Sequence, residues 1–263
     1  MNSNLILNLY KARIIFMKSY TAEDFIKEEK LRNIFNQVFD KQTIEAVHEL
    51  ANKGYIDYLE HIISTGKEAH VYKAVDKAGN PRAVKIYKIE TSSFRNMRAY
   101  IEGDVRFKKV SSDRRDIVYQ WTRKEYKNLE RFTEASVRVP IPFAFYRNVL
   151  VMEFVGNEQA APTLKEAPFE NIEALYRKIV EELAKMVYKA KLVHADLSEY
   201  NILNHNNEPV IIDCGQAVLL SHPNAKEFFD RDVKNMCNYF RKKGLQKTPE
   251  EMKNAIKELK NSV

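Results

Sequence analysis

The first pattern along the chain is a run of apolar residues at helical spacing. Residues 22–60 are rich in Glu, Lys, Leu, Ile and Phe and contain no proline. Large apolar side chains recur there at intervals of about three and four, which predicts a helix packed by one face. These side chains are Phe25, Leu31, Ile34, Phe35, Val38 and Phe39. We expect the helical region to be interrupted at Gly54.

From about residue 62 the pattern becomes typical of β-strands. Ala69–Val75 and Arg82–Tyr87 are apolar-rich, and Asp76–Pro81 between them consists of turn-forming residues. This order predicts a β-hairpin. A further buried strand is predicted over Asn148–Gly156, and its final glycine marks an expected boundary between two lobes.

The segment between these strands is different in character. Residues 90–118 show no clear hydrophobic period and are dominated by Ser, Thr, Arg, Lys and Asp. We expect a basic loop or insertion there, followed by a helix at about 118–134.

The C-terminal part is predicted to be mainly helical. Glu170–Lys191 forms a long amphipathic pattern, and two short strands are expected around 201–204 and 210–213. Thr248–Glu251 reads Thr-Pro-Glu-Glu, a capping box with proline at the first helical position, which predicts a last helix.

Composition narrows the class of protein. The chain has 263 residues, of which 44% are hydrophobic and 30% charged, which is globular and excludes wholesale disorder. Glycine is scarce, with 7 residues, which excludes collagen-like and glycine-linker proteins. The two cysteines, Cys214 and Cys237, are too few for a disulfide framework or a four-cysteine zinc site. A reducing, cytoplasmic setting is therefore expected.

The charge is moderately basic, with 43 Lys and Arg against 36 Asp and Glu, or +7. Such a balance suits an acidic partner such as nucleic acid and serves solubility equally well. Phe94–Lys109 mixes aromatic and basic residues, so RNA binding by stacking and charge is the alternative to the solvated surface that we expect there. The basic residues Arg231, Arg241, Lys242 and Lys243 are interpreted as a solvated helix face. The apolar patch Leu5–Phe16 is interrupted by Lys11 and Arg13, so neither a transmembrane span nor a membrane partner is predicted.

The strongest chemical signal is the stretch His194–Asn201, which reads HADLSEYN, followed by Ile211–Gly215, which reads IIDCG. On a loop after a long helix, Asp196 would orient or deprotonate a hydroxyl, and Asn201 would offer an amide oxygen to a cation. Asp213, at the end of an apolar strand, supplies a further hard oxygen ligand for Mg²⁺. Phosphoryl transfer needs positioned cations because its transition state is stabilised electrostatically. Taken singly these residues are typical of structural positions, whereas the spaced set is specific.

Earlier segments supply the other parts of a phosphoryl-transfer site. Lys85 lies on the second hairpin strand, from which an ammonium reaches phosphates, and Glu125 on the following helix can pair with it. In Ser64–Ala69 (STGKEA), backbone N–H groups and the Ser64 hydroxyl would hold phosphates, and Lys67 would add charge. The segment lacks the three-glycine spacing of a phosphate loop, and an ordinary turn is the alternative.

Together these stretches resemble the RIO family of atypical serine/threonine protein kinases, specifically its type-one subfamily in a short, archaeal-like form. The resemblance spans about residues 60–245, and the STGKEA loop is its most diagnostic part. Phe94–Phe107 resembles the insertion that this subfamily has between the lysine strand and the glutamate helix. The matching segments are Ser64–Tyr72 (STGKEAHVY), Ala83–Tyr87 (AVKIY), Val151–Gly156 (VMEFVG), Ala161–Ala167 (APTLKEA), His194–Leu203 (HADLSEYNIL) and Ile211–Ala217 (IIDCGQA).

The resemblance implies an α+β, two-lobed protein-kinase-like fold. It places an N-terminal helical extension over residues 1–60 and a β-rich N-lobe over 61–156, with an insertion at about 90–117. An α-rich C-lobe follows over 157–263. The implied cofactors are ATP and Mg²⁺, with Mn²⁺ as an alternative to Mg²⁺.

The resemblance also assigns roles to individual residues. Asp196 and Asp213 are the implied catalytic residues, and Asn201 and Asp213 are the implied metal ligands. Ser111 and Ser112 are candidate autophosphorylation sites. The implied cofactor-binding residues are Ser64, Lys67, Lys85 and Glu125, with backbone groups of Glu153 and Val155 facing adenine.

The expected function is transfer of the γ-phosphoryl group of ATP to serine, including autophosphorylation, or hydrolysis of ATP with a phosphoaspartate at Asp213, in small ribosomal subunit maturation. The expected partners are ATP, a subunit precursor with its rRNA, and the protein itself, but not DNA. Ser198 stands where most serine/threonine kinases have a catalytic-loop lysine, Cys214 replaces the Phe of Asp-Phe-Gly, and no Ala-Pro-Glu follows. Recognition of peptide substrates is therefore open.

Two alternatives follow from the same residues. One is a nucleotide-gated ribosome-assembly factor whose output is binding. The other is a small-molecule phosphotransferase of the aminoglycoside type, which shares the His-x-Asp and Ile-Ile-Asp patterns. The STGKEA loop and the insertion argue against the second alternative.

Overall fold

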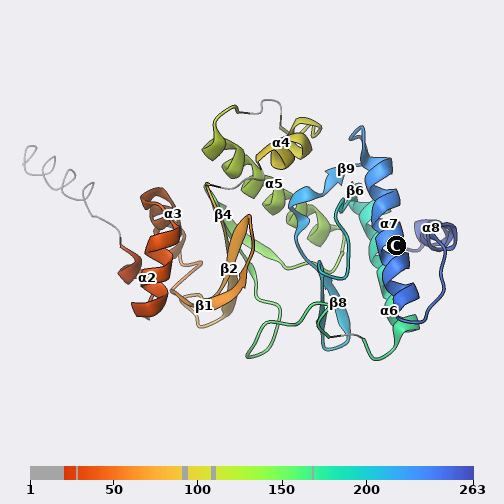
Figure 1. Ribbon diagram of the computed structural model, residues 1–263, viewed down its shortest axis with the longest axis horizontal. Coiled ribbons are helices and arrows are strands. Elements are labelled where there is room, and N and C mark those ends of the chain that lie inside the picture. Colours follow the sequence, from red (N-terminus) through yellow and green to blue (C-terminus); the bar gives the residue numbers. More distant parts are fainter. Residues whose placement is uncertain (1–20, 28, 91–93, 108–110, 168) are drawn as a thin grey trace, which may run out of the picture.

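A five-stranded antiparallel sheet and a group of helices lie side by side in the computed structural model (Figure 1). The structure describes residues 21–27, 29–90, 94–107, 111–167 and 169–263. Predictions that concern the patch Leu5–Phe16, residue Lys109 and the side chains of Leu31 and Ile34 lie outside what is described. Within these ranges no helix is long and apolar enough to cross a membrane.

The sheet has the strand order β1-β2-β3-β5-β4. Its strands are β1 (Tyr58–Thr65), β2 (Ala69–Val75), β3 (Pro81–Tyr87), β4 (Pro142–Tyr146) and β5 (Val149–Glu153). The predicted hairpin is confirmed, with Tyr72 opposite Val84 and Val71 opposite Lys85. The strand expected at 148–156 is confirmed as β5, whereas the edge strand β4 was not predicted.

One face of the sheet is covered by η1 (Ala22–Asp24), α2 (Glu29–Val38) and α3 (Lys41–Asn52). The prediction of a helical region over 22–60 is wrong in extent. Asp40 accepts a hydrogen bond from the Thr43 N–H at 2.9 Å and caps α3, so a new helix begins there, and β1 already starts at Tyr58. Val38, expected on the packed face, is 43% exposed.

Residues 90–118 contain a helix, α4 (Phe94–Glu102), where a loop was predicted. Met97 and Ile101 lie on one face of α4 and are buried against Trp121. The polar composition hid this short amphipathic pattern. The helix expected at 118–134 is confirmed and begins earlier, as α5 (Arg114–Glu134).

The C-terminal part is mainly helical, as predicted. Its helices are α6 (Ile172–Lys185), the π-helix η2 (Met186–Ala190), the 3₁₀-helix η3 (Cys214–Gln216), α7 (Ala225–Lys242), α8 (Pro249–Glu258) and the 3₁₀-helix η4 (Leu259–Asn261). Its strands are β6 (Leu192–Val193), β7 (Ile202–His205), β8 (Glu208–Ile211) and β9 (Val218–Leu219). The capping box of α8 is confirmed by the Glu251 N–H, which donates to the Thr248 hydroxyl at 3.2 Å.

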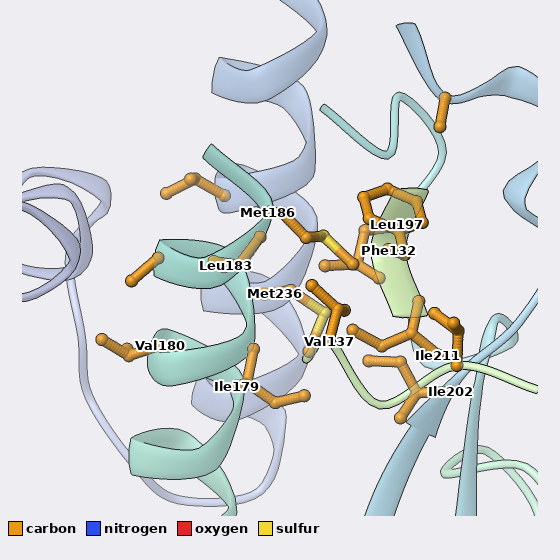
Figure 2. Packing of buried hydrophobic residues seen from close by; sticks show 14 of the residues in the cluster. Phe132, Val137, Ile179, Val180, Leu183, Met186, Leu197, Ile202, Ile211 and Met236 are labelled. Atoms are coloured by element: carbon orange, nitrogen blue, oxygen red, sulfur yellow. The ribbon is translucent and has the colours of Figure 1, made fainter. Parts of the chain in front are cut away.

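The core of this part anchors the loops that carry the candidate residues (Figure 2). Ile202 of β7 and Ile211 of β8 pair across the small hairpin and are buried beside Leu197. Ile179 of α6 and Met236 of α7 belong to the same core. The loops on either side of the hairpin are thereby held on a rigid base.

Candidate active site

A cleft between the sheet and the β7–β8 hairpin consists of two adjoining cavities of about 300 and 470 Å³. Ser64, Val71, Lys85 and Asp213 line both of them. The larger cavity has an apolar lining that includes Ala83, Met152, Leu203 and Ile212. The smaller has charged and polar groups that include Lys67, Glu68, Asp196 and Gln216. The cleft thus suits a ligand with a flat apolar end and a charged end.

Lys85 reaches this cleft because side chains alternate along a strand. Val84 and Ile86 of β3 point into the core under α2 and α3, so Lys85 points the other way. Its Nζ donates to Glu125 Oε1 at 2.9 Å and also contacts the Asp213 carboxylate. Burial alone disfavours the ammonium, but the charges of Asp213 and Glu125 outweigh it and raise the pKa of Lys85 well above its ordinary value.

The β7–β8 hairpin brings Asn201 and Asp213 to the same place. Asn201 precedes β7 and Asp213 follows β8, and the Ile212 N–H donates to the Asn201 carbonyl at 3.0 Å. Asp213 has a left-handed backbone, with φ 61° and ψ 51°, and its side chain is 53% exposed. The charge of Lys85 lowers the pKa of Asp213.

Asp196 and Asn201 are in direct contact. The Asn201 amide donates to the Asp196 carbonyl oxygen at 2.8 Å and to Asp196 Oδ2 at 3.3 Å, and Gln216 donates to the same carboxylate at 3.1 Å. Burial raises the pKa of Asp196. His194 Nε2 donates to the Ile212 carbonyl at 2.9 Å, and burial lowers the pKa of His194 to about 4. The histidine is thus a neutral structural link between the two loops.

Helix α7 holds the loop that contains Asp196. Asp232 is fully buried and accepts the backbone N–H groups of Ala195 and Leu197 at 2.8 and 2.9 Å. Arg231 is exposed, as predicted, and its guanidinium also donates to the Ala195 carbonyl and to the Tyr100 hydroxyl. These contacts fix the backbone on both sides of Asp196.

The turn between β1 and β2 forms the rim of the smaller cavity. Ser64 and Lys67 line it and are exposed. The Gly66 N–H, however, donates to the Ala69 carbonyl at 2.9 Å and closes the turn, and Lys88 donates to the Gly66 carbonyl at 2.8 Å. This glycine N–H is therefore not available to an anion, and Ser64 and Lys67 are left at the rim of the cavity.

Glu153 and Val155 lie where β5 leaves the sheet, beside the larger cavity. The Glu153 carboxylate is held by Arg138 through two bonds of 2.8 Å, and its N–H donates to the Ile141 carbonyl at 2.8 Å. The Val155 carbonyl accepts from the Ala161 N–H at 2.9 Å. These bonds do not involve the Glu153 carbonyl or the Val155 N–H, which are the backbone groups expected to face a ligand.

Ser111 and Ser112 lie outside the cleft, beside the start of α5. The Ser111 hydroxyl donates to Asp116 at 3.0 Å and accepts the Asp113 N–H at 3.1 Å, and Ser112 is exposed. Neither serine lines either cavity of the described cleft.

The donor set fits a hard divalent cation. The amide nitrogen of Asn201 is held by Asp196, so its oxygen is the atom available to a cation. Asn201 does not itself line either cavity, whereas the half-exposed Asp213 lines both. No group of three or more His, Cys, Asp or Glu able to hold a metal occurs in the described part of the chain. Oxygen ligands from an amide and a carboxylate suit Mg²⁺, which takes much of its coordination from water and phosphate oxygens.

Several residues of the site were not predicted. Asp232 gave no signal, because a helical aspartate is ordinary until the fold places it under the Asp196 loop. Gln216 lies within the IIDCGQA stretch, so its position soon after Asp213 was a usable signal. Met152 of the larger cavity lies in the predicted strand, next to Glu153.

Comparison with known proteins shows the family to which the chain belongs. The RIO domain model matches residues 70–253. The RIO-type serine/threonine-protein kinase Rio1 of Haloferax volcanii is 46% identical over 236 residues, covering 88% of this chain and 81% of that protein. The protein of that name from Methanocaldococcus jannaschii is 41% identical over 231 residues, covering 86% and 79%. Human serine/threonine-protein kinase RIO1 is 37% identical over 82% of this chain but 39% of its own length.

Solved structures agree on the fold. The crystal structure of the Rio2 kinase from Chaetomium thermophilum has a TM-score of 0.62 at 25% identity, covering 81% of this chain and 66% of that one. Its ADP/Mg²⁺-phosphoaspartate complex has a TM-score of 0.63 at 24% identity, covering 83% and 66%.

The sheet, the helical region and the cleft between them therefore define a protein kinase, and the two-lobed α+β fold expected from the sequence is confirmed. Within that class the chain belongs to the RIO domain family and is a RIO-type serine/threonine kinase.

Proposed function

We propose that this protein transfers the γ-phosphoryl group of MgATP to a serine hydroxyl, including its own, or to water. The observation that carries the proposal is Lys85, which contacts both Glu125 and Asp213 at the wall of a cleft that Asp196 also lines. A buried lysine held by a helical glutamate and a loop aspartate is the arrangement that binds nucleotide phosphates in kinases.

Each group has a task in the proposed reaction. Asp196 accepts a hydrogen bond from the attacking hydroxyl and orients it, and its raised pKa makes the carboxylate a better proton acceptor. Lys85 binds phosphate oxygens, and Ser64 and Lys67 approach them from the β1–β2 turn. Asn201 and Asp213 would hold Mg²⁺, or Mn²⁺, which neutralises charge on the phosphates when bound.

Adenine is assigned to the larger cavity. Its apolar walls match a flat base, and the Glu153 carbonyl and the Val155 N–H supply one acceptor and one donor at its edge. The charged rim of the smaller cavity then receives the phosphates.

The physiological partner is proposed to be a small ribosomal subunit precursor with its rRNA. The support is the resemblance to the type-one RIO kinases and the net charge of +7. Binding of the full chain to purified precursor particles, measured against salt concentration, tests this part separately from catalysis.

Incubation with labelled ATP and Mg²⁺ tests the reaction. We expect label on the wild-type protein and a loss of at least about 100-fold in Asp196→Asn. The matched control is Asp230→Asn, an aspartate on the outside of α7, which keeps the wild-type rate. Acid-stable label on Ser111 or Ser112 identifies serine transfer, and hydroxylamine-sensitive label on Asp213 identifies the hydrolytic route. Absence of both label and phosphate release contradicts the proposal.

A further inference from the structure

We propose that Lys124 and Asn128 are positioning residues that hold the segment after Asp213 in its metal-binding conformation, and that Arg106 orients Asn128. The inference rests on the proposed function, because it takes Asp213 as a metal ligand. None of the three residues lines the cleft as described.

The contacts are direct and buried. Lys124 Nζ donates to the Gly215 and Ala217 carbonyls at 2.8 and 2.5 Å. The Asn128 amide donates to the Cys214 and Ala217 carbonyls at 2.7 and 2.9 Å. Both side chains are 0% exposed. Three carbonyl groups of the short segment after Asp213 are thus held from one helix.

These side chains share one face of α5 with Trp121. Residues spaced by three and four lie on the same side of a helix, and the Trp121 ring lies so close to Gly215 that a Cβ there would be 3.0 Å from it. Glu125, next to Lys124, holds Lys85. Helix α5 therefore fixes both the phosphate-binding lysine and the metal-binding segment in one rigid frame.

Simple packing does not require a lysine here. A fully buried ammonium is costly, and burial lowers the pKa of Lys124 to about 7. An apolar side chain would fill the same volume without that cost. A side chain with several donors can hold several carbonyl groups in fixed directions, which an apolar side chain cannot do. Asp213 has φ 61°, and a backbone in this conformation persists only where its surroundings hold it.

Arg106 connects this network to the insertion. Its guanidinium donates to Asn128 Oδ1 at 2.7 Å and pairs with Asp104, which is 2% exposed. Because Arg106 offers only donors, the oxygen of the Asn128 amide must face it, and the NH₂ group must face the carbonyls. The segment after α4, which contains Arg106, is thereby connected to the segment after Asp213 by the side-chain amide of Asn128.

The test measures how strongly Mg²⁺ tightens nucleotide binding in the full chain. A fluorescent ATP analogue is titrated in EDTA and again over a range of MgCl₂ concentrations, with wild type, Lys124→Met and the control Thr122→Val. Thr122 is a buried neighbour on α5 whose hydroxyl donates to the Val118 carbonyl, so the control removes a buried hydrogen bond without touching the segment.

We expect Lys124→Met to need at least about tenfold more Mg²⁺ for half of the effect, the size typical of residues behind metal ligands. Its affinity in EDTA should stay within about twofold of wild type, because Lys85 still binds phosphates. Asn128→Leu should shift in the same direction, and Arg106→Met by less. The two further variants decide the matter if Lys124→Met does not fold.

An unchanged Mg²⁺ requirement in all three variants, or an equal shift in Thr122→Val, overturns the inference. A wild type that binds the nucleotide more tightly with Mg²⁺ but transfers no phosphate overturns the proposed function instead, and leaves the positioning question decided by the binding data. A wild type without any Mg²⁺ effect overturns the metal assignment of Asp213 and the inference with it.

Discussion

Lys85 is a buried cation with carboxylate partners on two sides, and Tyr87 donates to the same Glu125 carboxylate. Glu125 is 1% exposed, whereas Asp213 is 53% exposed at its side chain. The two carboxylates therefore differ in what their loss would cost. Removing the partner of a buried charge lowers the free energy of unfolding by about 3–5 kcal/mol, whereas removing one member of an exposed ion pair lowers it by about 1 kcal/mol or less.

Lys85→Met and Asp213→Asn should both reduce ATP turnover by at least about 100-fold. Only Lys85→Met should also lower the free energy of unfolding by about 3 kcal/mol, because it leaves the buried Glu125 carboxylate without its cationic partner. Phosphate release and urea denaturation measure the two effects. Wild-type phosphate release in either variant would show that the site is wrongly assigned.

The buried His194 should make the free energy of unfolding decrease in acid. Its pKa is about 4 in the folded protein and about 6.5 in an unfolded chain. As pH falls from about 6.5 to 4, the unfolded chain takes up a proton that the folded protein refuses, so stability decreases, by up to about 3 kcal/mol. Below pH 4 this term no longer changes.

Urea denaturation of wild type and His194→Gln between pH 4 and 8 measures the term. The difference in stability between them should be largest above pH 6.5 and shrink toward pH 4. The burial of Asp232, which raises its pKa to about 7, acts with the opposite sign but is common to both proteins. A constant difference across this range would contradict the prediction.

At the scale of elements, α5 connects the parts of the molecule. It supplies Glu125 to the cleft, packs against α4 through Trp121, and is tied to α3 by the pair of Arg115 with Asp40. Asp40 has a double role, because it also caps α3.

Asp40→Ala should therefore lower the free energy of unfolding by about 1–2 kcal/mol, most of it from the lost cap. Asp40→Asn keeps a good capping residue and loses only a part-exposed ion pair, so it should lose less than about 1 kcal/mol. Urea denaturation compares the two. Equal losses would mean that the ion pair, and not the cap, is the dominant contribution.

At the scale of the whole molecule, the cleft is formed by elements far apart in the sequence. The chain leaves the sheet through Gly156, which has φ 154°, and a Cβ there would lie 2.2 Å from the Gln159 carbonyl oxygen. Glycine is thus required at this crossing. A ligand that filled the cleft would contact both the sheet and the hairpin, so its binding energy would stabilise the molecule as a unit.

MgATP at about 100 times its dissociation constant should stabilise the folded protein by about 2.7 kcal/mol and raise Tm by about 5–10 °C. Differential scanning fluorimetry measures the shift. Lys85→Met at the same nucleotide concentration should show little of it, and an equal shift in that variant would place the nucleotide elsewhere.

Local sequence determined the predictions that were confirmed. The β2–β3 hairpin follows from alternation around a turn, and the α8 cap from Thr248 and Glu251. The set Lys85, Asp196 and Asp213 stays a prediction as to role, and it was visible because its chemistry is rare and its order along the chain is specific. These features depend on neighbouring residues, or on residue types that few other roles use.

The remaining features depend on contacts that sequence does not display. Helix α4 forms in a charged segment because Met97 and Ile101 meet Trp121, and Asp232 matters because α7 passes under the Asp196 loop. Lys124 reads as an ordinary helical lysine until the fold buries it. Sequence alone determined which groups are candidates for the chemistry. Tertiary structure decided what holds them, because burial and hydrogen-bond partners arise only when distant segments meet.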